Sequence, residues 1–411
     1  MKKLFIAVLL LPVFWILLPK QEAISQDKKT FSAYIKAVME EAAIPGLAIA
    51  KIDNGEATLH TFGFADVTQN RPVTQDTLFN IASISKPIMG VVLLKLVEQG
   101  KLELDRDIND YLPFKVDNPK LENETITLRH LVTHTSGIAD YYDVNSFTAN
   151  RDPETTLEAH LKSLLTPGGY LYEQGAYYLD HQPGTHRKYS NLASALAGYL
   201  VEATTGESLA QYSVDHLFKP MGMDNTRWRL EGLSFAEIAV PYEVESCIPY
   251  TPVCGDFESP KLNYVINEYF NPPIAFKRFV PQPHYGNPQY PDGGVRTSIK
   301  ELSLFLTQLL KNQTMAGEPL LSATIFQQMI SIQAPETVSK GQRFFWRDNS
   351  MGLIGHMGSD PGVFAAMYFD PNKKDGFIIL MNRGLDTKSG SAMKSIAAKL
   401  MNQESDVRES R

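Results

Sequence analysis

Apolar residues near the start of the chain follow first a helical and then an extended pattern. Between residues 28 and 42 they recur at helical spacing, which predicts a helix that ends before Pro45-Gly46. Two apolar runs follow at 47–52 and 57–64, and the Asn54-Gly55 turn between them predicts a β-hairpin because Asn-Gly tolerates positive φ. This part of the chain is therefore expected to fold as helix, strand, strand.

The middle of the chain, from about 83 to 235, has a helical and loop-rich pattern. Helices are predicted over four ranges: 83–98, 126–134, 189–204 and 208–217. Two segments, 140–183 and 240–291, fit no regular element and are rich in tyrosine, the second also in proline. Loops of this length in a compact domain are usually functional or disordered, and their aromatic content favours packed loops that wall a site.

The last part of the chain returns to strands. Apolar runs at 363–369 and 376–381 predict two strands joined by a polar turn, and residues 344–355 are a candidate to pair with them. Amphipathic helices are predicted at 298–310 and 389–401.

Strands at both ends of the chain around a helical middle predict the fold class. We expect an α/β (α+β) domain over residues 26–405, with one antiparallel sheet built from both termini and flanked by helices. A mostly helical subdomain is inserted into it. The sheet part covers about 30–82 and 292–402, the helical and loop part about 83–291, and residues 403–411 form a polar tail.

The first 25 residues have the order of a secretory signal peptide. Met-Lys-Lys precedes an apolar run at 4–18 and a short polar stretch, with a plausible cleavage site after Ser25. This predicts export to the periplasm or the extracellular space. The run contains Pro12 and is shorter than the roughly 20 residues that span a bilayer, so no membrane span is expected after cleavage, although an uncleaved anchor stays open.

Composition and charge narrow the class of protein. The 411 residues are 43% hydrophobic and 21% charged, as in a folded globular protein, and the net charge of −7 disfavours a nucleic-acid partner. In an oxidising compartment, Cys247 and Cys254 are a candidate disulfide, with two buried free thiols as the alternative.

Several familiar catalytic signatures are absent from the sequence. It contains no H-E-x-x-H, no paired C-x-x-C and no G-x-S-x-G motif. His130 and His134 have the i, i+4 spacing of a metal pair, but no acidic third ligand is spaced with them, which favours packing or hydrogen bonding. No metal or other cofactor is expected.

Three short motifs, in a fixed order, carry candidate chemistry. Ser83 and Lys86 form an S-x-x-K motif at the predicted start of a helix, where one helical face brings the amine to the hydroxyl. The alternative is that Ser83 merely caps the helix. The other two motifs are Tyr189 with Asn191, and His356 with Gly358.

In this order the motifs resemble those of the serine β-lactamase and penicillin-binding-protein superfamily. The resemblance is to its class C β-lactamase-related branch, which includes family VIII carboxylesterases and D-aminopeptidases, and it covers roughly residues 30–400. Three further segments also resemble this branch: 131–137, 182–184 and 292–295.

The resemblance implies a serine hydrolase that works through an acyl-enzyme. Ser83 is the nucleophile, and Lys86 and Tyr189 share the acid and base work, because a serine hydroxyl is weak until a base takes its proton. A close lysine ammonium would favour the ionised form of the phenol. Asn191 would bond to Lys86 or to a substrate amide.

Backbone N–H groups of Ser83 and of the late strand near 358–363 would bind the oxyanion. His356 stands where a lysine is frequent in this superfamily, so dependence on a substrate carboxylate should be weaker. We therefore expect carboxylic esters first, then D-amino-acid peptides or amides, and β-lactams last. A D,D-peptidase of cell-wall stem peptides and a non-catalytic sensor module are the alternatives. The expected partner is a small-molecule or peptide substrate, and the sequence does not predict an oligomeric state.

Overall fold

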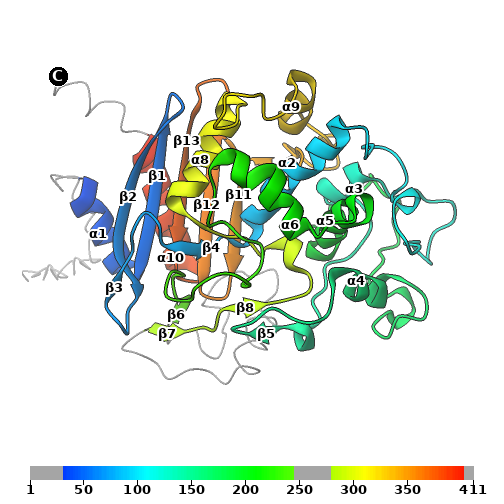
Figure 1. Cartoon of the computed structure of the whole chain (residues 1–411), viewed down its shortest axis with the longest axis horizontal. Helices are drawn as coiled ribbons and strands as arrows, with labels where there is room; N and C mark the ends of the chain where they lie inside the picture. The colour runs from blue at the N-terminus through cyan, green and yellow to red at the C-terminus, as the bar shows by residue number, and fades with distance from the viewer. Residues whose placement is uncertain (1–30, 245–278, 402–411) are drawn as a thin grey trace, which may run out of the picture.

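A single antiparallel sheet joins the two ends of the chain. The computed structural model describes residues 31–244 and 279–401. Leu47 pairs with Met381, so early and late strands are neighbours in the sheet (Figure 1). Across the sheet the strands are β10 (Arg347–Asp348), β11 (Ile354–Asp360), β12 (Val363–Asp370), β13 (Asp375–Met381), β1 (Gly46–Asp53), β2 (Glu56–Asp66) and β3 (Arg71–Pro72). The predicted fold class is confirmed.

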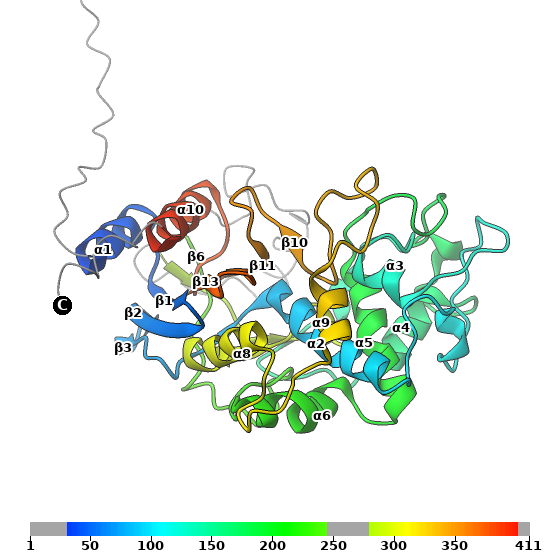
Figure 2. The ribbon, with the colours of Figure 1, turned by 90° about the horizontal axis from the view of Figure 1, so that it is seen from above.

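Alternate residues of the central strands bury on opposite faces of the sheet. In β13, Ile379 and Met381 pack with α1 (Phe31–Glu41) and α10 (Thr387–Met401), which lie together on one face (Figure 2). Ile378 and Leu380 belong to the core on the other face, where α8 (Ile299–Lys311) covers β1 and β13. The period of two along the strand explains why both faces carry apolar residues.

The helical part packs around one central helix. α2 (Ser85–Glu98) is buried along nearly its whole length and contacts α5 (Asn191–Thr205) and α9 (Ala323–Ile330). A helix that is apolar on all sides must be enclosed in this way. Among the described residues, this part of the chain also contains the α-helices α3 (Leu128–Val132), α4 (Leu157–Leu165) and α6 (Leu209–Ser213).

Several predicted element boundaries shift in the structure. The helix expected from Ser83 begins at Ser85, because residues 82–84 form a separate 3₁₀ turn. The helix expected from Tyr189 begins at Asn191, and Ser190 caps it by accepting a hydrogen bond from the N–H of Ala193 at 2.9 Å. The helix expected at 208–217 is α6 followed by a π turn.

Two predictions of irregular structure are wrong, and one predicted strand is confirmed in part. The segment 140–183 contains α4, which Thr156 caps, and the short strand β5 (Thr148–Ala149). Segment 240–291 contains β6 (Tyr242–Val244), β7 (Phe279–Pro281) and β8 (Tyr285–Gly286). The candidate strand at 344–355 contains β10 and the first two residues of β11, which pair with each other, and the rest of β11 lies beyond this range.

Some predicted features lie outside the described residues. These are the signal peptide, Cys247 and Cys254, and the tail at 403–411. Among residues 31–244 and 279–401, none of the helices is both long and apolar enough to cross a membrane.

Candidate active site

Ser83 lies on a tight turn between a strand and the central helix. β4 (Leu78–Asn80) pairs with β9 (Arg296–Ser298), and the side-chain oxygen of Asn80 then accepts a hydrogen bond from the N–H of Ala82 at 2.7 Å. Ala82 has φ of 45°, a left-handed conformation that costs free energy in a residue other than glycine. α2 has no side-chain cap, so Ser83 does not cap this helix.

Lys86 is fully buried, and its amine is fixed by three hydrogen bonds. Nζ donates to Ser83 Oγ at 2.9 Å, to Asn191 Oδ1 at 2.6 Å and to the backbone oxygen of Asp292 at 2.5 Å. An ammonium group has three donors and no acceptor, so all three are used. The lysine is therefore held with its nitrogen against the serine hydroxyl.

Tyr189 contacts the same serine from another side. Its hydroxyl donates to Ser83 Oγ at 2.9 Å, and Lys86 Nζ lies 5.0 Å from the centre of its ring. Burial raises the pKa of Tyr189, and the nearby Lys86 opposes this rise only in part. Lys86 thus lowers the pKa of the phenol as expected, but burial raises it more. The phenol therefore stays protonated in the resting site.

Gly358 allows the edge of the sheet to reach the serine turn. A Cβ at this position would lie 2.2 Å from the backbone oxygen of Ile81 and 3.0 Å from the nitrogen of Ser83. Only glycine tolerates so close an approach of two backbones. β11 therefore lies directly against the N–H of the candidate nucleophile.

His356 lies on the same strand and faces the tyrosine. Its ring centre is 6.4 Å from that of Tyr189. Burial and the positive charge of Lys86 lower the pKa of His356 to about 3, so the imidazole is neutral at pH 7. The sequence placed His356 and Gly358 before a strand, whereas the structure places both within β11.

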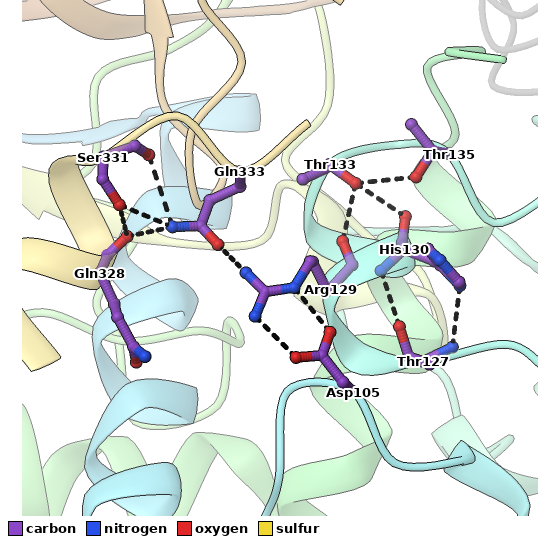
Figure 3. Close-up of polar contacts among 9 residues, drawn as sticks. All are labelled: Asp105, Thr127, Arg129, His130, Thr133, Thr135, Gln328, Ser331 and Gln333. Atoms are coloured by element: carbon purple, nitrogen blue, oxygen red, sulfur yellow. Dashed lines mark hydrogen bonds and ion pairs between the residues drawn. The ribbon is translucent and has the colours of Figure 1, made fainter. Parts of the chain in front are cut away.

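His130 and His134 have separate structural roles. The N–H of Thr127 donates to His130 Nδ1, and the N–H of His130 donates to the Thr127 hydroxyl, which completes a capping box at the start of α3 (Figure 3). His134 is buried, and its ring packs on that of Tyr189 at 4.3 Å between centres. No cluster of three metal-binding side chains occurs among the described residues.

The helix that precedes His134 is anchored by Arg129. Its guanidinium forms two hydrogen bonds with Asp105, at 2.6 and 2.8 Å, and also donates to Gln333 Oε1 (Figure 3). Bidentate pairs of this kind fix direction as well as distance. The hydrogen bonds of Arg129 therefore hold α3 in place. His134 follows this helix and contacts the ring of Tyr189.

A buried carboxyl group lies behind the lysine. The side chain of Asp292 accepts hydrogen bonds from the Tyr142 hydroxyl at 2.5 Å and from Gln289 Nε2 at 3.1 Å. Burial raises the pKa of Asp292 to about 7, although the charge of Lys86 opposes this rise. Asp360, at the end of β11, has a pKa raised to about 6 by burial.

The structure brings Ser83, Lys86, Tyr189 and Asn191 into one hydrogen-bonded group, with His356 and Gly358 beside it. No motif in the sequence assigns a role to Asn80, Asp140 or the carbonyl of Asp292. Two of the segments that resemble the superfamily, 131–137 and 292–295, pointed to His134 and Asp292. Asn80 and Asp140 carried no comparable signal.

A buried lysine and a tyrosine that bond to one serine, at the edge of an antiparallel sheet, define the β-lactamase/transpeptidase-like class of serine acyl-transferases and hydrolases. The chain belongs to the Beta-lactamase family, whose model matches residues 31–400.

Two curated relatives are similar in sequence to this chain. Protein flp of Staphylococcus aureus (strain MW2) is 27% identical over 272 residues, which are 63% of this chain and 52% of the relative. The chain thus spans about half the length of that relative. Penicillin-binding protein 4* of Bacillus subtilis (strain 168) is 28% identical over 354 residues, 83% of this chain and 69% of the relative.

Solved structures share the fold. An octameric penicillin-binding protein homologue from Pyrococcus abyssi superposes with a TM-score of 0.63 at 23% identity, over 90% of this chain and 76% of the other. The D-alanine carboxypeptidase AmpC from Burkholderia cenocepacia has a TM-score of 0.61 at 20% identity, over 89% and 96%. At these identities the likeness establishes the fold alone.

Proposed function

We propose that this serine hydrolase forms an acyl-enzyme at Ser83 and acts on carboxylic esters or on peptides and amides of D-amino acids. One observation carries the proposal: Ser83 Oγ accepts hydrogen bonds from both Lys86 Nζ and Tyr189 OH, each at 2.9 Å. A hydroxyl between a base and an acid is the arrangement that nucleophilic catalysis requires.

In acylation, the resting ammonium of Lys86 first releases a proton to solvent. The resulting neutral amine then takes the proton of Ser83 as Oγ bonds to the substrate carbonyl carbon. The oxyanion that forms is bound by backbone N–H groups of Ser83 and of β11. The bond to the leaving group then breaks, and Tyr189 gives its phenol proton to the departing nitrogen or oxygen. The phenolate regains a proton from the ammonium of Lys86, which leaves the neutral amine and the protonated phenol for deacylation.

In deacylation, water replaces the leaving group and the proton path runs in reverse. The pair takes the proton of water as its oxygen attacks the acyl carbon, and Ser83 Oγ leaves as a protonated hydroxyl. The raised pKa of Tyr189 supports its role as the acid, because a phenol that stays protonated can donate.

The walls of the site and the relatives support the proposed substrate class. His356 is neutral at pH 7, which supports esters and amides over substrates that need a fixed ammonium partner. A solved structure described as a D-alanine carboxypeptidase supports D-amino-acid peptides, and slow β-lactam hydrolysis belongs to the same chemistry. The N-terminal pattern supports work outside the cytoplasm.

Labelling followed by intact mass tests the nucleophile. Wild-type protein should gain one adduct with a fluorophosphonate probe and one with benzylpenicillin, and Ser83→Ala should gain neither. Ser395→Ala, an exposed serine on α10, should label like the wild type. An unlabelled wild type favours the non-catalytic sensor, and a labelled Ser83→Ala protein removes Ser83 as the nucleophile. Rates on p-nitrophenyl esters, D-alanine anilides and nitrocefin then rank the substrate classes.

A further inference from the structure

His134 contacts the chain on both sides of the candidate catalytic tyrosine. Its backbone oxygen accepts the N–H of Lys188 at 2.9 Å, and its Nδ1 accepts the N–H of Ser190 at 3.3 Å. These two donors are the residues directly before and after Tyr189. One histidine thus fixes the backbone from which the phenol extends.

The ring of His134 also packs on the ring of the tyrosine. The ring centres are 4.3 Å apart, and Phe345 contacts the same imidazole at 5.8 Å between centres. Aromatic contacts at these distances restrict the orientation of both rings. With its backbone and its ring both held, Tyr189 directs its hydroxyl to Ser83 Oγ, 2.9 Å away.

The backbone of His134 has a left-handed conformation, with φ of 58°. This conformation costs free energy in a residue other than glycine and persists only where the surrounding contacts outweigh the cost. Here the carbonyl oxygen and the ring of the same residue both contact the 188–190 segment. Backbone strain of this kind is frequent at active sites, which favours a role in the chemistry over packing alone.

The imidazole of His134 is neutral, as these contacts require. The side chain is buried, and burial lowers its pKa well below the usual value, with a smaller contribution from the charges of Arg187 and Lys86. A neutral imidazole that accepts a hydrogen bond at Nδ1 carries its proton on Nε2. The acceptor for the N–H of Ser190 is therefore present throughout the neutral pH range.

We propose that His134 is the positioning residue for Tyr189 and holds the phenol on Ser83 Oγ, from where its proton reaches the leaving group. This inference rests on the proposed function and adds a residue to it. His134 itself does not touch the reacting atoms. Its effect on the rate should therefore depend on how strongly the leaving group needs the proton of the phenol.

Two esters of one acid test this dependence. The ethyl and p-nitrophenyl esters of N-acetyl-D-alanine form the same acyl-enzyme but release different alcohols. Ethoxide is strongly basic and must gain a proton as it departs, whereas p-nitrophenolate can leave without one. A residue that acts through the phenol should matter more for the ethyl ester.

Three variants divide the contacts of His134. His134→Phe keeps a ring but loses the Nδ1 acceptor, and His134→Asn keeps an acceptor and tolerates the left-handed backbone but loses the ring. We expect each to lower kcat/KM for the ethyl ester by about tenfold and His134→Ala to lower it by about 100-fold, because a shift of about 1 Å can cost that much. The loss should lie in kcat rather than in KM, and the p-nitrophenyl ester should lose much less.

The matched control is a second histidine that packs on a tyrosine. The exposed His216 lies 4.1 Å from Tyr212 between ring centres, and its substitution His216→Ala should keep the wild-type rates on both esters. A double variant then separates positioning from packing. If His134 acts through the phenol, His134→Phe should add little to the loss in Tyr189→Phe, because the effects of coupled residues do not add.

Additive losses in the double variant, equal losses on the two esters, or folded His134 variants with wild-type rates would contradict the inference. If circular dichroism shows that none of the three variants folds, His134 maintains the fold instead, and the inference fails. It also fails if the wild type hydrolyses only the p-nitrophenyl ester, since no positioned acid is then in use. In each of these cases labelling of Ser83 leaves the proposed function standing. If Ser83 is not labelled, both fail.

Discussion

Asp140 holds Asn191 with both of its carboxylate oxygens. Oδ1 accepts the backbone N–H of Asn191 at 2.7 Å, and Oδ2 accepts its side-chain amide at 3.1 Å. The amide is thereby fixed with its oxygen toward Lys86 Nζ. Loss of this clamp lets the amide rotate and present a donor to the lysine.

We therefore expect Asp140→Ala to lower kcat/KM for a p-nitrophenyl ester by about tenfold, as loss of a positioning hydrogen bond does. Asp140→Asn keeps one oxygen acceptor, so its kcat/KM should lie between those of the wild type and Asp140→Ala. Wild-type rates in Asp140→Ala would show that Asn191 needs no such clamp.

Gly358→Ala should disable the site without unfolding the protein. The added methyl group would overlap the backbone of Ile81 and press on the nitrogen of Ser83, so β11 must move away from the turn. A displacement of about 1 Å can cost about 100-fold in rate, and we expect at least that loss in kcat. Gly390→Ala on α10 meets only a flexible leucine side chain and is the control. Equal activity of the two variants would contradict the close approach.

Tyr189→Phe removes a hydroxyl and little else. We expect turnover to fall by about 100- to 10,000-fold, the usual contribution of a general acid or base, with a similar fall in Lys86→Ala. Tyr170→Phe alters an exposed tyrosine and should react at the wild-type rate. Circular dichroism checks that each variant is folded. A Tyr189→Phe protein with normal turnover would remove the phenol from the proton path.

His356 should not contribute to the pH dependence of activity near neutrality. Its pKa of about 3 leaves it neutral between pH 5 and 8. We expect His356→Gln to keep the shape of the kcat/KM profile over this range, whatever its absolute rate. If the wild-type kcat/KM profile changes near pH 6.5 and the profile of His356→Gln does not, the imidazole of His356 titrates there.

The raised pKa of Asp292 predicts that the folded protein loses stability as pH rises. Its pKa is about 7 in the folded protein and about 3.9 when unfolded, so the folded state binds more protons between these values. The free energy of unfolding must then fall as pH rises through this window. Asp292→Asn keeps an oxygen acceptor but cannot ionise. In urea titrations, its free energy of unfolding should therefore drop between pH 5 and pH 8 by about 1 kcal/mol less than that of the wild type, or by a larger difference. Asp76→Asn, at an exposed carboxylate, should keep the wild-type slope.

The two ends of the fold could be predicted because their pattern is local. β12 and β13 are apolar runs around a polar turn, and α8 has a clear amphipathic stripe. Most of β11 was missed because its sequence is rich in glycine and polar residues. Its extended form comes from pairing with β12, where Gly358 faces Ala365, and a window of sequence does not contain that partner.

The candidate site divides in the same way. The residue types and spacing at 83, 86, 189 and 191 predict a nucleophile with an acid and a base beside it. The structure brings these four residues together. The carbonyl of Asp292 and the left-handed turn at Ala82 are backbone features, which no residue type signals.

The pairing of Leu47 with Met381 also bears on synthesis at the ribosome. Ser83, Lys86 and Tyr189 emerge long before the strand that carries Gly358, so a nascent chain holds the reactive side chains without the sheet edge that completes their surroundings. Closure of the sheet must wait for a contact across 334 positions, and such long-range contacts form late and slowly. We therefore expect that a product truncated before β11 lacks the complete candidate site.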